Sequence, residues 1–99
     1  MNLIKKITIK HKLNGLYNDL QEECFKTSHD WRNHKISDMS AMYSYKGIAR
    51  YATVRYRHIC ETYGIKDTDI KNDNRFGEMI YDIENTVDNL RESLKVKEA

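Results

Sequence analysis

The 99-residue chain contains no proline and only four glycines. These two residue types most often end helices and form tight turns, and folds made of many short strands need them at frequent intervals. Their scarcity therefore disfavours an all-β sandwich or barrel and favours long, uninterrupted helices. The length suits one hydrophobic core, so we expect a single helical domain over residues 1–99.

The clearest apolar pattern lies in the middle of the chain and predicts a helix over residues 38–63. Its members are alternately three and four residues apart, which aligns them along one side of a helix, as in a coiled coil. They are Met42, Tyr45, Ala49, Ala52, Tyr56, Ile59 and Tyr63. Ser37 or Ser40 can cap the start. Gly64 can end the helix in the left-handed conformation, followed by the apolar contact of Ile65.

A second pattern of the same kind predicts a helix over residues 74–95. It consists of Phe76, Ile80, Ile83, Val87, Leu90 and Leu94. Asp73 or Asn74 can cap this helix, and its acids gather toward the start and its bases toward the end, as the helix dipole favours. The polar residues 66–72 are expected to connect the two helices.

The first helix is expected over residues 3–26 and is less regular. Its short apolar pattern is Leu13, Tyr17, Leu20 and Cys24, widened by Leu16 and Phe25. Gly15 weakens a helix by about 1 kcal/mol relative to alanine and is a candidate position for a kink. Residues 27–35 are expected to form a connector, with Trp31 tucked against the other helices.

These segments predict an all-α fold, a small antiparallel three-helix bundle with long central and C-terminal helices and coiled-coil-like seams. The two long seams extend further than the regular seam of the first helix. Exposed seam ends would form an apolar patch, so we expect a homo-oligomer, a dimer or a larger assembly.

The net charge of +2 conceals alternating blocks of charge. Residues 1–12 carry four lysines and no acid, and residues 13–30 have a net charge of -3. Residues 31–63 then have a net charge of +4 and residues 64–99 a net charge of -3. The basic central block coincides with the helix expected over residues 38–63.

One side of that central helix is both aromatic and basic. Opposite the apolar seam lie Tyr43, Gly47, Arg50, Tyr51, Val54, Arg57 and His58. Tyrosine rings stack on nucleobases and arginine pairs with phosphate through two hydrogen bonds. The sequence therefore predicts binding of an anionic ligand, a nucleotide signal or nucleic acid. The expected ligand-binding residues are Tyr43, Lys46, Arg50, Tyr51, Arg55 and Arg57.

The same side chains also suit a protein interface, because tyrosine and arginine are enriched there. In that alternative the arginines pair with acids of the last helix, Asp82, Glu84 or Asp88. A third, less favoured alternative is a small DNA-binding transcriptional regulator in which the basic residues 5–12 track phosphates. The spacing does not separate binding of a ligand from binding of a protein.

No residue pattern predicts catalysis, a metal or a cofactor. His29 and His34 are five residues apart and point to different sides of a regular helix, unlike a zinc-binding pair. Cys24 and Cys60 lack the close spacing of metal or redox motifs and are expected to be free thiols. The chain also lacks a phosphate-binding glycine loop. We therefore expect a protein that is not an enzyme.

The chain shows neither the apolar stretch of a signal peptide nor a membrane-spanning segment, so we expect a cytoplasmic protein without membrane contact. Its richness in Ile, Lys, Asn and Tyr indicates A+T-rich codons and points to a phage or mobile element. The function expected is that of a small binding protein that modulates a host process such as defence, in the host cytoplasm. The alternative is an inhibitor or adaptor that docks on a host enzyme or regulator.

Overall fold

A computed structural model describes residues 3–65 and 75–98 of the chain. These residues form three α-helices and no strand, which are α1 (Leu3–Arg32), α2 (Asp38–Tyr63) and α4 (Arg75–Glu98). The prediction of an all-α three-helix bundle with long central and C-terminal helices is confirmed. The bounds predicted for the central helix, residues 38–63, are those of α2.

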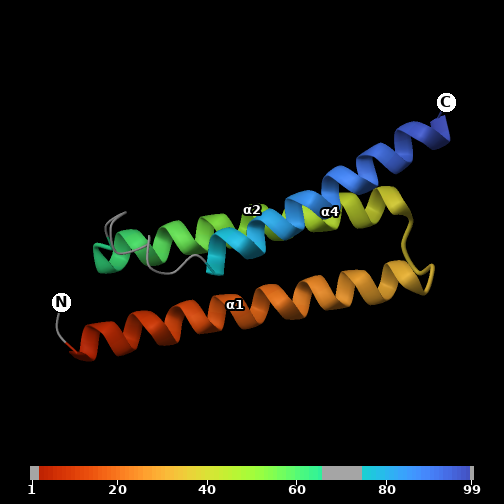
Figure 1. Cartoon of the computed structure of the whole chain (residues 1–99). Helices are drawn as coiled ribbons and strands as arrows, with labels where there is room; N and C mark the ends of the chain where they lie inside the picture. Colours follow the sequence, from red (N-terminus) through yellow and green to blue (C-terminus); the bar gives the residue numbers. More distant parts are fainter. Residues whose placement is uncertain (1–2, 66–74, 99) are drawn as a thin grey trace.

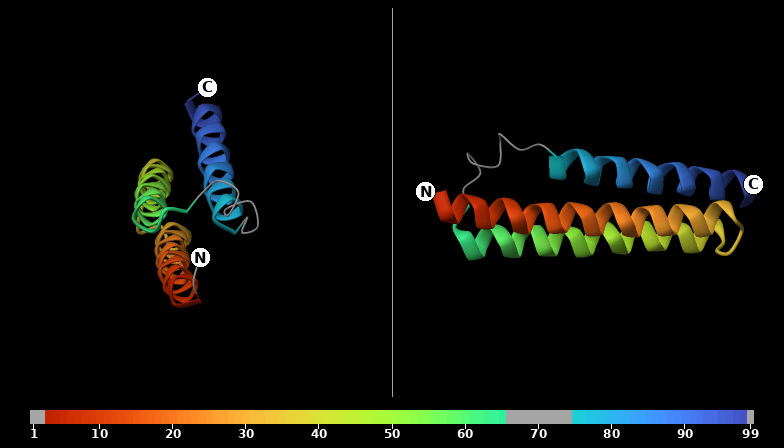
Figure 2. Two further views of the ribbon diagram at one scale, coloured as in Figure 1. Left: turned by 90° about the vertical axis from the view of Figure 1, so that its left-hand side faces the viewer. Right: turned by 90° about the horizontal axis from the view of Figure 1, so that it is seen from below.

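The helices form an elongated molecule of 56 × 23 × 17 Å (Figure 1). The chain reverses direction between α1 and α2, and α4 runs antiparallel to α2 (Figure 1). α2 packs along both other helices, whereas α1 and α4 touch each other much less. The C-terminal part of α4 diverges from its neighbours (Figures 1 and 2). α2 is thus the central element of the bundle.

The predicted seams of α2 and α4 form the core. Met42, Tyr45, Ala52 and Ile59 of α2 are buried, as are Ile83, Val87 and Leu90 of α4. The remaining seam residues are half-buried and pack against this core. The seam ends therefore do not form the exposed patch from which we predicted a homo-oligomer, because Tyr63, Phe76 and Leu94 at these ends are only partly exposed and pack against the core. Oligomerisation itself stays a prediction.

The predicted caps of α2 are confirmed. Ser37 is the N-cap, and its hydroxyl oxygen accepts a hydrogen bond of 3.1 Å from the Ser40 amide. Gly64 ends the helix with φ 62°, a left-handed conformation that glycine adopts without strain. The Ile65 amide then donates to the Cys60 carbonyl at 2.9 Å, and Ile65 packs on the core. The predicted cap at Asp73 or Asn74 and the connection 66–72 lie outside the described residues.

α1 differs most from its prediction, because it continues beyond residue 26 to Arg32. Residues 27–32 were expected to form a connector, but Thr27 is buried and Trp31 packs against the core. The Trp31 indole also donates a 2.8 Å hydrogen bond to the Asp38 carboxylate at the start of α2. The helix ends where His34 adopts φ 57° and the Lys35 amide donates to the Asp30 carbonyl at 2.8 Å. The predicted tucking of Trp31 is thus confirmed.

α1 differs from its prediction at two further positions, Gly15 and Phe25. The helix continues without a break through Gly15, the candidate position for a kink (Figure 1). Phe25, which was expected to widen the buried side of this helix, is 73% exposed. It follows the seam residue Cys24 by one position, and the rotation of one residue carries it away from the core toward solvent. α4 begins at Arg75 and continues to Glu98, slightly beyond the predicted range 74–95.

Candidate functional site

The outer side of α2 carries the aromatic and basic side chains that the sequence singled out. Tyr43 is 60% exposed and Tyr51 is 65% exposed. Val54, which lies between Tyr51 and Arg57 in the sequence, is 58% exposed. Gly47, Arg50, Arg57 and His58 are also exposed. We call this set, together with Lys46, the outer face of α2. It lies opposite the buried seam, as the spacing predicted.

The cations of this face are available for an external partner. Lys46 lies near the ring of Tyr43, with its ammonium nitrogen 5.7 Å from the ring centre. Within the part of the chain that the structure describes, Lys46, Arg50 and Arg57 make no ion pair with an acid. The alternative in which these arginines pair with Asp82, Glu84 or Asp88 of α4 is therefore not observed.

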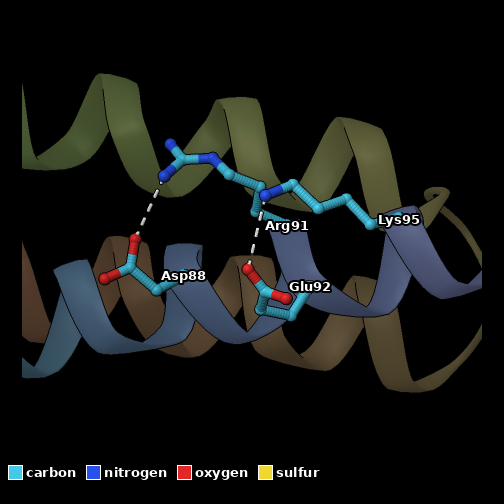
Figure 3. A network of polar contacts seen from close by, with 4 residues as sticks. All are labelled: Asp88, Arg91, Glu92 and Lys95. Atoms are coloured by element: carbon cyan, nitrogen blue, oxygen red, sulfur yellow. Dashed lines mark hydrogen bonds and ion pairs between the residues drawn. The ribbon is translucent and has the colours of Figure 1, made fainter.

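The cations of α4 behave differently. Arg91 pairs with Asp88 at 3.2 Å and Lys95 with Glu92 at 3.5 Å, all within one exposed side of the helix (Figure 3). These local pairs balance positive and negative charge on α4. The outer face of α2 is less balanced: one exposed acid, Glu61, lies on the same helix side, four residues after Arg57, and it makes no ion pair with Arg57 among the described residues.

Arg55 is the one predicted ligand-binding residue that the structure engages elsewhere. Its guanidinium donates to the Asp19 carboxylate of α1 at 2.7 Å, and it lies 5.8 Å from the ring centre of Tyr51. Arg55 therefore joins α2 to α1 and supports the Tyr51 ring. The other five predicted residues lie together on the outer face of α2 or at its edge.

Beside this face, a groove of about 750 Å³ lies between α1 and α2. Its floor is apolar and is formed by Leu16, Leu20, Ile36, Ile48 and Ala52. Its α1 wall is acidic and carries Asp19, Glu22, Glu23 and Asp30, against only Lys26 on the same helix. The groove therefore disfavours anions on its α1 side, and only its α2 rim, at Gly47, Tyr51 and Arg55, belongs to the predicted site.

This acidic wall was not foreseen from the sequence. The charge count places its four acids in a negatively charged block but does not show which side of the helix they occupy. The signal was present, since Asp19, Glu23 and Asp30 are four and seven residues apart and share one side of a helix.

A smaller hollow lies among all three helices and contains Cys24 of α1 and Tyr45 of α2. Burial, and to a lesser extent the neighbouring Glu23 carboxylate, raises the pKa of the Cys24 thiol. Burial also raises the pKa of Tyr45, although the Ser28 hydroxyl and the Arg32 charge act in the opposite direction. Both groups are therefore protonated at neutral pH, and the Cys24 thiol is not activated as a nucleophile.

The two histidines at the end of α1 and in the turn after it, His29 and His34, do not converge on one site. His29 lies 3.8 Å from the Asp30 carboxylate and contacts the Asn33 amide at 3.2 Å, while His34 occupies the turn after α1. Among the described residues, no group of three or more His, Cys, Asp or Glu side chains is arranged to hold a metal ion. None of the described helices is sufficiently long and apolar to cross a membrane.

Comparison of the chain with protein-family models, with curated proteins and with solved structures found no match. The surface chemistry of the bundle is therefore what indicates a function.

Proposed function

We propose that the outer face of α2 binds single-stranded nucleic acid. The observation that carries the proposal is the combination of two exposed tyrosines with three exposed cations, Lys46, Arg50 and Arg57, none of which forms an ion pair within the described residues. A single acid, Glu61, shares this side of α2, so the side keeps a net positive charge. Bases stack on tyrosine rings whatever their sequence, and cations in a row follow the phosphates of a strand.

The shape of the face favours a strand over an isolated nucleotide. Small-molecule sites are concave and enclose most of their ligand, whereas the outer side of a helix is convex. The neighbouring groove is hollow, but its α1 wall is acidic. From Lys46 to Arg57 the helix rises about 16 Å, so its cations can contact several successive phosphates of one strand.

The wider role in this proposal is that of a small binding protein that is not an enzyme and acts in the cytoplasm. The A+T-rich codon usage that the composition implies supports a phage or mobile-element origin. Coating of a single strand by such a protein would alter host processes that act on exposed strands, among them defence.

The experiment measures binding of a labelled single-stranded oligonucleotide and of its duplex by fluorescence anisotropy at several salt concentrations. The variant Arg50→Glu with Arg57→Glu is expected to weaken binding of the single strand by more than about tenfold and to reduce the salt slope by about 1.4, the value for two lost phosphate contacts. The native protein should bind the single strand more tightly than the duplex.

The matched control is Arg91→Glu with Lys95→Glu, which changes the net charge equally on the exposed side of α4 (Figure 3). This control should retain most of the binding. Equal losses in both variants would mean that only net charge matters, and the outer face of α2 would not be the site. Absence of binding by the native protein at low salt would exclude the proposed function.

One observation favours the second candidate, an inhibitor or adaptor that docks on a host protein. Val54 is 58% exposed in the middle of the face and offers an apolar contact that phosphates do not use. Exposed Tyr, Arg and aliphatic side chains together are typical of protein interfaces. This candidate gains support only if no oligonucleotide binds.

A further inference from the structure

The groove between α1 and α2 lies on the side of this helix pair that α4 does not cover. α4 packs on the other side, where Cys24 and Ser28 of α1 line a hollow together with Met79 and Ile83 of α4. Viewed along the bundle, α4 lies to one side of α1 and α2 (Figure 2). The groove is lined by α1, by α2 and by Ile36 in the turn between them, and by no described residue of α4. A fourth helix placed there would complete a four-helix bundle.

The length of the groove fits a helix of a few turns. On α1 its lining extends from Leu16 to Asp30, about 21 Å along the helix axis. On α2 the lining extends from Ser44 to Arg55, about 16 Å. These lengths correspond to about three to four turns, since each turn of a helix rises about 5.4 Å. The lining is therefore elongated along the bundle, as a site for a helix requires.

The groove offers apolar side chains to a partner. Ile36 and Ile48 are partly exposed, and Tyr51 at the α2 rim is 65% exposed, whereas the other apolar residues of the floor are almost fully buried. Beside them, a Cβ atom at Gly47 would meet no atom within 4 Å, so a partner can approach the α2 backbone closely here. Ile36, Ile48 and Tyr51 are therefore the apolar contacts available in the groove.

The lining of the groove is negatively charged. It contains four acids, all from α1, against Lys26 and Arg55, so its net charge is -2. The Arg55 guanidinium is already paired with the Asp19 carboxylate. Glu22 and Glu23 are both exposed, and neither forms an ion pair within the described residues. The groove is therefore complementary to a partner that brings positive charge to the α1 wall.

We propose that this groove binds a cationic amphipathic helix of a partner protein, about three to four turns long. Its aliphatic side chains, three and four residues apart, contact Ile36, Ile48 and Tyr51. Its lysine and arginine side chains lie on the flank that faces Glu22 and Glu23. The proposal does not rest on the function proposed for the outer face of α2, because the acids of α1 repel nucleic acid from the groove.

The probe is a fluorescein-labelled synthetic peptide of about 14 residues, which spans about 21 Å as a helix, with leucines three and four residues apart and lysines elsewhere. Fluorescence anisotropy with the full-length chain measures its dissociation constant. Glu22→Lys with Glu23→Lys is expected to raise this constant by more than about tenfold, because attraction becomes repulsion. The matched control, Glu78→Lys with Glu84→Lys, makes the same change in net charge on exposed residues of α4 and should have much less effect.

A second pair of variants tests the apolar part of the contact. Gly47→Leu places a side chain in the groove and should also raise the dissociation constant by more than about tenfold. Gly15→Leu is the control, because Gly15 does not line the groove, and it should leave the constant nearly unchanged. An added Cβ atom meets no neighbour within 4 Å at either position, and circular dichroism verifies that each variant is folded.

No binding of the peptide by the native chain would overturn the proposal. Equal binding of a peptide with the same residues in scrambled order would also overturn it, because charge alone would then attract the peptide. Equal losses in the Glu22, Glu23 variant and in the α4 control would show that the groove is not the site. If the native chain forms a dimer that Gly47→Leu dissociates and Gly15→Leu does not, the groove binds a second copy of this chain and not a partner protein.

Discussion

The outer sides of α1 and α2 are both exposed, but their charges are arranged differently. α1 carries lysines in its first part and acids in its second, with large apolar side chains at both ends. The outer face of α2 combines tyrosines with Lys46, Arg50 and Arg57, and the one acid on the same helix side, Glu61, leaves an excess of positive charge.

This difference indicates which helix an anionic partner can approach. The excess of positive charge on the outer face of α2 attracts a partner that supplies negative charge. The acids in the second part of α1 line the groove beside α2 and repel such a partner. Charge changes on the two helices should therefore act on binding in opposite directions.

The largest expected effect is on the free energy of unfolding, which should depend strongly on a buried side chain and weakly on an exposed one. Leu16 of α1 is 1% exposed, and Leu16→Ala should lower the free energy of unfolding by about 2–5 kcal/mol, because it removes buried methyl groups and leaves a cavity. Val54 of α2 is 58% exposed, and Val54→Ala should change the free energy of unfolding by less than about 0.5 kcal/mol. Urea unfolding of both variants measures the two values. Similar losses would mean that another chain buries Val54.

The next effect concerns the tyrosines of α2. Tyr43→Ala and Tyr51→Ala should each weaken binding of a single-stranded oligonucleotide by about 1–3 kcal/mol, the contribution of one stacked base. Tyr43→Phe and Tyr51→Phe keep the ring and should bind almost as tightly as the native protein. If the phenylalanine variants lose as much binding as the alanine variants, the hydroxyls rather than the rings make the contact.

A smaller effect is expected at Gly15 of α1. Gly15→Ala should stabilise the chain by about 1 kcal/mol, since alanine favours a helix and meets no neighbour within 4 Å. Thermal unfolding of the variant and of the native chain measures the difference. A loss of stability would mean that α1 needs a glycine at this position.

The sequence predicted the fold where apolar spacing was regular. The seams of α2 and α4 and the caps Ser37 and Gly64 follow from local rules, and the structure confirms them. The prediction ends α1 too early, at residue 26, because the buried Thr27 is a polar residue and interrupts the apolar pattern. The seam in fact continues from Leu20 through Cys24 and Thr27 to Trp31, spaced by four, three and four residues.

The candidate site was predictable only in part, for a physical reason. Helical spacing shows which side chains share one side of α2, and the exposure of Tyr43, Arg50 and Arg57 agrees with that expectation. Spacing within a helix does not show which residue of a different helix lies opposite. The pairing of Arg55 with Asp19, 36 residues earlier in the chain, depends on how α1 and α2 align, and only the packed structure gives this alignment.

The ion pair of Arg55 with Asp19 links α2 to α1, and its removal has the smallest expected effect on stability. Asp19→Ala should lower the free energy of unfolding by less than about 1 kcal/mol, because both side chains of the pair are partly exposed. It also releases Arg55 at the edge of the outer face of α2. Binding of a single strand should then tighten, and its salt slope should steepen by about 0.7, the value for one added phosphate contact.

Glu22→Ala is the matched control, because it removes one acid from the same wall of the groove without releasing a cation. It should tighten binding less than Asp19→Ala does and leave the salt slope nearly unchanged. Addition of Arg55→Ala should cancel the gain of Asp19→Ala. If Asp19→Ala and Glu22→Ala act equally, the acids of α1 repel the strand through their charge alone. Arg55 would then be a purely structural link, and the binding surface would consist of the outer face of α2 without it.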